Sequence, residues 1–476
     1  MTSPRSKPLV IDVDGSLLRT DMLFESFLAA IGTDAPRALK IAWNTRKDRP
    51  RMKSELASLS QIQVDRLPVN PEVLALAKAA QSEGREVVLA SGSDKKLVQA
   101  LANRLGIKGE HLGSEPGLNL TGKNKAVALV ERFGKNGFHY VGDSDVDLSV
   151  WECSSAAIAV APSARVRVKL EALGMPVTYV GKGWSARNLV KALRPHQWIK
   201  NVLLLLPLFA VHRLDFHGFE RVLLAIVAFS LAASSIYIVN DLLDLDADRQ
   251  HERKHLRPFA AGSVPIQVGM VTSLLLGITA LTLASIIDWK MLGLVAIYMS
   301  LSLAYSVYLK RQRWIDIWVL AILYTLRVVA GAVAGSVAAS GWLIAFVFPV
   351  FMALGCVKRM TEVARAKHDK RLPGRAYAKG DRGDLLNMSV LSAFNADIIF
   401  LAYTYSETAY LLYAGIWELR WVVIPVSAWM YRMIWTGWAG KQNYDPIVFA
   451  MRDRVGLSLA IVSVLGLYNA AALAGV

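Results

Sequence analysis

The pattern of apolar and polar positions changes abruptly near residue 190 of this chain. Before that point, apolar runs of strand length alternate with amphipathic stretches, whereas from about residue 200 long apolar segments follow one another. We count about nine such segments of about 15 to 24 residues, roughly the length with which a helix crosses a bilayer. Their centres lie near Leu205, Leu231, Leu276, Tyr298, Leu326, Val350, Ile398, Val426 and Val464. The pattern therefore predicts an α/β domain followed by an all-α transmembrane bundle of about nine helices.

The first domain is expected to span residues 1–180 and the membrane domain residues 194–476, with a glycine-containing linker at 181–193. In the first domain, the apolar strands PLVIDVDGS, REVVLASGS and GFHYVGDSDVD alternate with helical stretches at 94–104 and 124–133. This alternation predicts a parallel sheet covered by helices, whose ligands bind at the carboxyl ends of the strands.

A mostly helical insertion at about residues 20–80 interrupts this alternation and carries a strongly basic stretch. The stretch is either a solvated face or a surface that contacts anionic lipid or a lipid-borne phosphate. Its basic residues are Arg37, Lys40, Arg46, Lys47, Arg49, Arg51 and Lys53.

Basic residues between the apolar segments are concentrated on alternate loops. The loops at 240–265, 310–314, 358–385 and 438–454 hold almost all of them. Because positive charge marks cytoplasmic loops, we expect a multi-pass protein of the inner (plasma) membrane with its N-terminal domain in the cytoplasm. The net charge of +16 then reflects loops beside anionic lipid, and nucleic acid is not an expected partner. The two cysteines show no C-x-x-C spacing and suggest neither a zinc site nor a disulfide framework.

Polar side chains follow the predicted strands of the first domain. Asp12 and Asp14 end the first strand, Ser91 ends the second, and a lysine, Lys125, opens a helix. The third strand element ends in two further acids, Asp143 and Asp147. Carboxylate oxygens at one edge of a sheet predict a Mg²⁺ site built from these four acids, with the lysine as a phosphate-balancing cation.

A second acidic cluster follows the second apolar segment, in IVNDLLDLDADRQHERKHLRPFAAG. Asn240, Asp241, Asp244 and Asp248 are spaced to share one helical face, where like charges need a cation to neutralise them. Oxygen ligands without His or Cys favour Mg²⁺ together with substrate phosphates. The bases that follow could bind the remaining phosphate oxygens, whereas the alternative is a solvated acidic and basic loop. These bases are Arg249, Arg253, Lys254 and Arg257.

Further cations lie in or at the edges of the apolar segments. Each could be half of a buried ion pair, but together they favour a polar cavity that binds substrate. We select Lys200, Arg327, Lys358, Arg359 and Arg432 as candidate substrate-binding residues.

The block NDLLDLDADR resembles the aspartate motif of the UbiA prenyltransferase superfamily, and the likeness covers about residues 190–476. RPHQWIKNVL, VKRMTE and MRDR are similar to the decaprenyl-phosphate phosphoribosyltransferase branch. That resemblance implies Mg²⁺-dependent transfer of ribose 5-phosphate from phosphoribosyl diphosphate to a polyprenyl phosphate. Asp241, Asp244 and Asp248 would hold Mg²⁺ on the diphosphate, and Asn240 would orient it.

The first domain resembles the haloacid dehalogenase superfamily over about residues 8–180, because all four of its polar elements occur in order. This resemblance implies that Asp12 attacks phosphorus, that Asp14 protonates the leaving group, and that Ser91 and Lys125 orient the phosphate. Asp143 would bind Mg²⁺ with help from Asp147.

The two resemblances together suggest a sequence of reactions, transfer followed by removal of the 5-phosphate from the lipid product. Three alternatives remain: a prenyltransferase that uses an isoprenyl diphosphate, a membrane transporter, and a first domain that only regulates. Aromatic prenyltransferases carry a second D-x-x-x-D motif in the loop where this chain has Lys358, Arg359 and Glu362. This substitution favours phosphate-bearing substrates on both sides of the reaction. The sequence predicts no particular oligomeric state.

Overall fold

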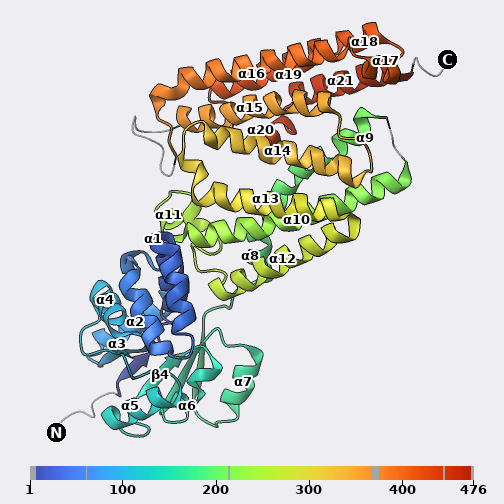
Figure 1. The fold of residues 1–476 in the computed structure, drawn as a ribbon. Helices are drawn as coiled ribbons and strands as arrows, with labels where there is room; N and C mark the ends of the chain where they lie inside the picture. Colours follow the sequence, from blue (N-terminus) through green and yellow to red (C-terminus); the bar gives the residue numbers. More distant parts are fainter. Residues whose placement is uncertain (1–6, 61, 213–214, 366–374, 443–444, 473–476) are drawn as a thin grey trace. The chain divides into compact units, whose positions relative to one another are not determined.

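The computed structural model describes residues 7–60, 62–212, 215–365, 375–442 and 445–472 (Figure 1). The chain forms two compact units. One consists of Met1–Leu193 with Tyr237–Thr272, and the other of Arg194–Ile236 with Ser273–Val476. The loop that carries the second acidic cluster therefore packs with the N-terminal domain, although the sequence assigned it to the membrane domain.

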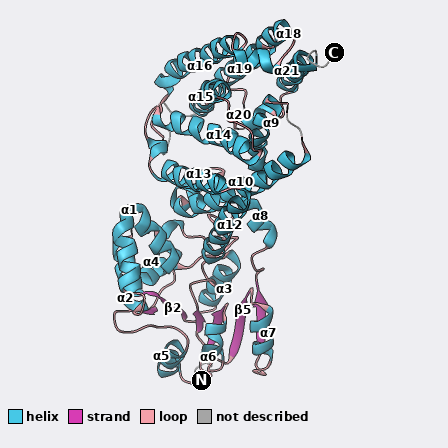
Figure 2. Cartoon of the chain, turned by 45° about the vertical axis from the view of Figure 1, so that its right-hand side comes forward, coloured by secondary structure: helices cyan, strands magenta, loops and turns pink. Residues whose placement is uncertain are grey.

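The first unit contains a parallel sheet, as the sequence predicted (Figure 2). The sheet has six strands in the order β3-β2-β1-β4-β5-β6. The first strand lies between β2 and β4, so the three strands that end in polar residues are neighbours. The strands are β1 (Leu9–Ile11), β2 (Val87–Asp94), β3 (Leu112–Ser114), β4 (His139–Gly142), β5 (Ala156–Val160) and β6 (Val177–Val180).

Helices cover both faces of this sheet. Alternation along β1 sends Leu9 and Ile11 into one hydrophobic cluster and Val10 into the other, which is why the strand is apolar throughout. The covering helices are α3 (Pro71–Ser82), α4 (Lys95–Leu105), α5 (Lys123–Phe133), α6 (Leu148–Trp151) and α7 (Ala164–Glu171). The predicted linker ends in one more helix, α8 (Ala186–Leu193).

The predicted insertion divides into two parts. Helices α1 (Met22–Asn44), which is kinked at Asp34, and α2 (Arg49–Leu59) pack on each other and form the cap. In contrast, α3 buries Val73, Ala77 and Ala80 in the cluster under the sheet. The cap therefore ends earlier than residue 80, because the apolar face of α3 matches the sheet.

The acidic loop begins where α10 (Phe216–Leu243) ends and includes α11 (Leu245–Arg249) and the short helix η4 (Lys254–Leu256). Asp244 marks the break between α10 and α11. The chain then enters α12 (Ile266–Ile287). Asp241 therefore lies in the last turn of the long helix α10, Asp244 lies at the break, and Asp248 lies on the short helix α11.

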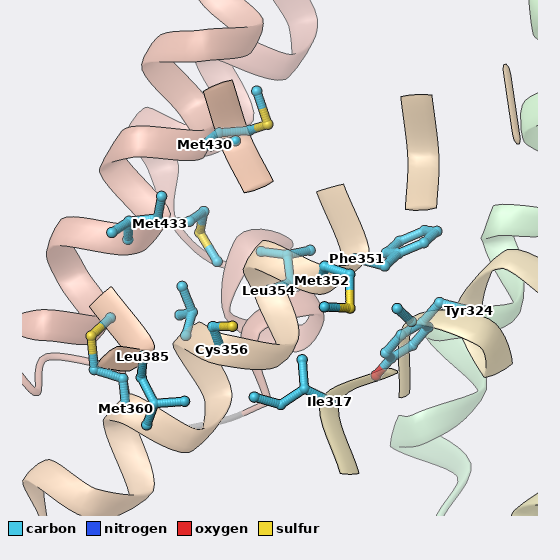
Figure 3. Packing of buried hydrophobic residues seen from close by; sticks show 14 of the residues in the cluster. Ile317, Tyr324, Phe351, Met352, Leu354, Cys356, Met360, Leu385, Met430 and Met433 are labelled. Atoms are coloured by element: carbon cyan, nitrogen blue, oxygen red, sulfur yellow. The ribbon is translucent and has the colours of Figure 1, made fainter. Parts of the chain in front are cut away.

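The second unit is all-α, as predicted. Its main hydrophobic cluster is formed by side chains of α14, α15, α16 and α19. Tyr324, Phe351, Cys356 and Met433 are among them (Figure 3). Its long helices are α13 (Trp289–Val307), α14 (Ile315–Ala334), α15 (Gly341–Ala364), α16 (Arg382–Tyr403), α19 (Val423–Trp438) and α21 (Arg454–Ala472). The shorter ones are η3 (Pro195–Leu205), α9 (Leu206–Ala210), η5 (Leu309–Arg311), η6 (Lys379–Asp381), α17 (Glu407–Leu412), α18 (Ile416–Trp421) and α20 (Pro446–Ala450).

Within the described residues, seven helices are long and apolar enough to cross a membrane, where the sequence predicted about nine. The segment centred on Leu205 is instead a 3₁₀ helix followed by five residues of α-helix, with Pro207 near the junction. The segment centred on Val426 contains α19, which has only 16 residues. Hydropathy alone does not distinguish these shorter helices from full spans. The chain is a multi-pass membrane protein.

Candidate active sites

The carboxyl edge of the sheet brings together three acids from two strands. Asp12 follows β1, whereas Asp143 and Asp147 follow β4, and one oxygen from each lies within 4.8 Å of the others. Gly15 makes this approach possible, since a Cβ at that position would lie 2.4 Å from Asp143 Oδ2. The backbone of Gly15 also has a positive φ of 79°. Three carboxylate oxygens at this separation fit a hard divalent cation such as Mg²⁺.

Lys125 lies inside this acidic cluster. Its Nζ donates to Asp12 Oδ1 at 2.5 Å and to the Tyr140 hydroxyl at 2.9 Å, and that hydroxyl donates to Asp147 Oδ1 at 2.7 Å. Burial, aided by Asp147 and Asp14 and opposed by Lys125, raises the pKa of Asp12 to about 7. Burial alone would lower the pKa of Lys125, but the neighbouring acids raise it, so the lysine stays charged.

Asp14 is held by three donors. Ser91 Oγ and Ser93 Oγ donate to its Oδ2 at 2.9 and 2.7 Å, and the backbone N–H of Met22 donates to its Oδ1 at 2.8 Å. Asp14 does not belong to the three-acid group, so the sequence-based set of four ligands is represented here by three. Ser93 was missed, although the two-residue period of a strand places it on the same face as Ser91.

In the acidic loop, Asp241 and Asp248 are buried, and Arg257 lies between them. Arg257 Nη1 donates to Asp241 Oδ1 at 3.1 Å and to Asp248 Oδ2 at 2.6 Å, while Lys254 Nζ lies 3.9 Å from Asp248 Oδ1. The guanidinium thus occupies the place of a cation between two carboxylates. Asp241, Asp244 and Asp248 do not form a close three-acid group of the kind found at Asp12, within the part of the chain that the structure describes.

Asn240 supplies a second sign of a ligand site in this loop. Its Oδ1 is buried and has no hydrogen-bond partner among the described residues. A buried acceptor without a donor is costly, so a bound group that carries a cation or an N–H or O–H donor would satisfy it.

Arg249 binds the cap instead of pointing toward the acidic cluster. Its Nη2 and Nη1 donate to Glu25 Oε1 and Oε2 at 2.6 and 3.1 Å, and both side chains are only 6% exposed. Nearby, Gln267 Nε2 donates to Asp21 Oδ2 at 3.3 Å. The acidic loop is therefore tied to the first turn of α1, which itself follows Asp14 closely along the chain.

The second unit holds two of the predicted lysines around one carboxylate. Lys200 Nζ and Lys358 Nζ each donate to Asp445 Oδ2 at 2.9 Å. Two ammonium groups thus meet at one carboxylate, an arrangement that places cations where an anionic group could bind. Asp445 lies in the YDPIVFAMRDR segment, but it was not among the selected site residues.

The other predicted cations form well-defined internal contacts. Arg327 donates to Asn201 Oδ1 at 3.0 Å and to the Tyr298 hydroxyl at 2.9 Å. Arg432 forms a two-point pair with Asp453, with both distances at 2.7 Å. These contacts order the helices, and a role in substrate binding remains a prediction for both residues.

Arg359 is fully buried against Asp316, which is also fully buried. The guanidinium also donates to Glu362 Oε2 at 2.5 Å and to the Tyr305 hydroxyl at 2.7 Å. These contacts join α14 to α15, and removing one of the partners would leave a buried charge uncompensated. Substrate contact by Arg359 remains a prediction.

Two family models match the chain, one in each part. The model of the UbiA prenyltransferase family matches residues 202–452, and that of the haloacid dehalogenase-like hydrolases matches residues 9–152. The chain is therefore a membrane enzyme with a transferase domain and a phosphatase-type domain. It belongs to the UbiA prenyltransferase family, and its N-terminal domain is haloacid dehalogenase-like.

Individual relatives refine this assignment. Protein y4nM of Sinorhizobium fredii, which is uncharacterized, is 34% identical over 458 residues, covering 94% of this chain and 88% of that protein. The decaprenyl-phosphate phosphoribosyltransferase of Mycobacterium tuberculosis is 34% identical over 294 residues, covering 58% of this chain and 91% of that enzyme. A solved UbiA homolog from Archaeoglobus fulgidus, bound to GPP and Mg²⁺, is 16% identical with a TM-score of 0.46, covering 61% of this chain and 100% of that one.

Proposed function

We propose that the membrane domain transfers ribose 5-phosphate from phosphoribosyl diphosphate to a polyprenyl phosphate. The observation that carries this proposal is the 34% identity to the mycobacterial decaprenyl-phosphate phosphoribosyltransferase over 91% of its length. The cation-rich second unit supports it, because both substrates of such a reaction carry phosphate groups.

The acidic loop is assigned to the diphosphate of the donor. The bond from C1 of the ribose to the diphosphate breaks, and a bond from C1 to an oxygen of the lipid phosphate forms. Bound Mg²⁺ would neutralise the charge that accumulates on the leaving diphosphate. Asp241, Asp244 and Asp248 would hold the ion, and the unpaired acceptor of Asn240 supports a ligand at this position.

Arg257 has a distinct role in this account. Arg257 donates to both Asp241 and Asp248, so it must release at least one of them when a divalent cation binds to these carboxylates. A released guanidinium is free to bind a phosphate oxygen in two-point geometry. Lys254 Nζ lies 3.9 Å from Asp248 Oδ1 and adds positive charge at the same position.

The lipid phosphate is assigned to the cluster of Lys200, Asp445 and Lys358. The phosphate is already an anion, so attack needs positioning and charge stabilisation and no strong base. The meeting of two lysine ammonium groups at Asp445 supports this assignment.

The N-terminal domain is proposed to hydrolyse a phosphomonoester, the 5-phosphate of the lipid product. Asp12 attacks the phosphorus, the ester bond to the ribose O5 breaks, and Asp14 gives its proton to that oxygen. Water then cleaves the phosphorylated Asp12 and releases phosphate. Asp12, Asp143 and Asp147 form an all-oxygen ligand set that fits Mg²⁺ and would shield the charge of the phosphate.

The two reactions are proposed to occur on the cytoplasmic side of the inner membrane, where basic loops concentrate. An experiment with labelled phosphoribosyl diphosphate tests both steps in membranes that contain the full-length enzyme. The wild type should form a labelled lipid without the 5-phosphate, whereas Asp12→Asn should accumulate the phosphorylated lipid. Identical lipid products from both enzymes would exclude the second step.

A further inference from the structure

Lys53 of the cap contacts the phosphatase-type site and has no role in the mechanism proposed above. Lys53 lies on α2, and its Nζ donates to the backbone oxygen of Gly92 at 2.5 Å. Gly92 directly follows Ser91 in the second half of β2, and the Ser91 hydroxyl donates to Asp14 of the proposed site. The ammonium group of Lys53 is thus part of the wall of this site.

Among the residues that the structure describes, Lys53 forms no ion pair. Its hydrogen bond goes to a neutral carbonyl, and no carboxylate oxygen lies within 4.0 Å of its nitrogen in the described part of the chain. Burial lowers the pKa of Lys53, and among the nearby carboxylates Asp14 acts most strongly in the opposite direction. A partly buried ammonium group with spare N–H donors is stabilised when an anion binds beside it.

The position of Lys53 indicates which part of a substrate would supply that anion. Lys125 and the three-acid metal site already serve the phosphoryl group that is transferred to Asp12. Asp14, in contrast, protonates the leaving oxygen, so the side of the site near Asp14 receives the leaving group. The cap contributes Lys53 on this side.

We propose that Lys53 is a specificity-determining residue that selects phosphomonoesters whose leaving group carries a second anionic group. The inference rests on the proposed phosphatase function and extends it to a substrate class. A ribose 5-phosphate that bears a phosphodiester at C1 belongs to this class, as does any sugar bisphosphate. A phosphomonoester with a neutral leaving group does not.

The test compares ribose 1,5-bisphosphate with ribose 5-phosphate as substrates of the full-length enzyme, with phosphate release from C5 followed by ³¹P NMR. Lys53→Met should raise KM for the bisphosphate about 10- to 100-fold, as expected for loss of a charge-assisted hydrogen bond, and should change KM for ribose 5-phosphate less than about threefold. Lys53→Arg should restore part of the preference. Lys47→Met, which removes an exposed lysine just before the same cap helix, is the matched control.

Equal losses on both substrates would assign Lys53 a structural role and overturn the proposal, as would no loss on either. A wild-type enzyme that hydrolyses neither substrate would instead refute the phosphatase function itself. Thermal unfolding of Lys53→Met identifies a folding defect, which would lower activity on both substrates together.

Discussion

Arg249 of the acidic loop forms a buried two-point ion pair with Glu25 of the cap helix, with distances of 2.6 and 3.1 Å. Thr20 Oγ1 donates to the same Glu25 oxygen as Arg249 Nη2, at 2.6 Å. The pair joins an element of the transferase motif to the helix that begins beside Asp14. We interpret it as the contact that fixes the acidic loop on the phosphatase-type domain.

Glu25→Gln should therefore destabilise the protein, because it leaves the buried charge of Arg249 uncompensated. Removing one partner of a buried pair costs about 3–5 kcal/mol, and thermal unfolding in detergent measures it. Glu55→Gln breaks an exposed pair with Arg51 and should cost at most about 1 kcal/mol. A double-mutant cycle with Arg249→Gln should show coupling, and additive effects would contradict the interpretation.

Mg²⁺ binding to the phosphatase site should weaken as the pH falls. The pKa of Asp12 in the metal-free protein is about 7, so below pH 7 the ion must displace a proton from this carboxyl group. The apparent Kd should rise about tenfold for each pH unit below 7. Titration calorimetry at pH 8, 7 and 6 measures this dependence, and a constant Kd would show that Asp12 stays ionised without the metal.

Asp248→Asn should abolish lipid labelling and leave phosphatase activity on a soluble sugar phosphate within about twofold. The substitution removes one charge from the proposed Mg²⁺ ligands, and a lost ligand typically lowers metal-dependent rates by orders of magnitude. Asp246→Asn is the matched control, since Asp246 lies on α11 beside Asp248 but is not among the proposed Mg²⁺ ligands. Equal losses from both variants would point to misfolding of the loop.

Gly331→Ala should destabilise the membrane domain. A Cβ at residue 331 would lie 2.0 Å from the backbone oxygen of Leu204, so α14 and the 3₁₀ helix would have to separate. Overpacking of this kind costs about 1–3 kcal/mol. Gly293→Ala, in α13, meets no atom within 4 Å and should leave the unfolding temperature unchanged or raise it. Similar unfolding temperatures for wild type and Gly331→Ala would contradict this packing.

The sequence predicted which polar side chains meet at the carboxyl edge of the sheet, because the strand topology determines their position. Parallel strands place Asp12, Ser91 and Asp143 at the same edge of the sheet, independently of the conformation of the connecting loops. The ion-pair partners of the arginines in the acidic loop could not be predicted from the sequence. Arg249 and Arg257 both follow the acidic run, and only tertiary packing determines that Arg249 pairs with Glu25 while Arg257 pairs with Asp241 and Asp248. The segment near Leu205 was wrongly predicted to be a helix of membrane-spanning length, because hydropathy does not distinguish a 3₁₀ helix from an α-helix.

Donor competition tests the central claim most directly. Purified enzyme with a polyprenyl phosphate acceptor would receive labelled phosphoribosyl diphosphate and labelled isoprenyl diphosphate in separate reactions and together. The account predicts that label from phosphoribosyl diphosphate enters the lipid, that the isoprenyl donor is not used, and that Asp248→Asn abolishes the transfer. Consumption of the isoprenyl diphosphate with phosphoribosyl diphosphate left intact would contradict the account and assign the chain to prenyl transfer.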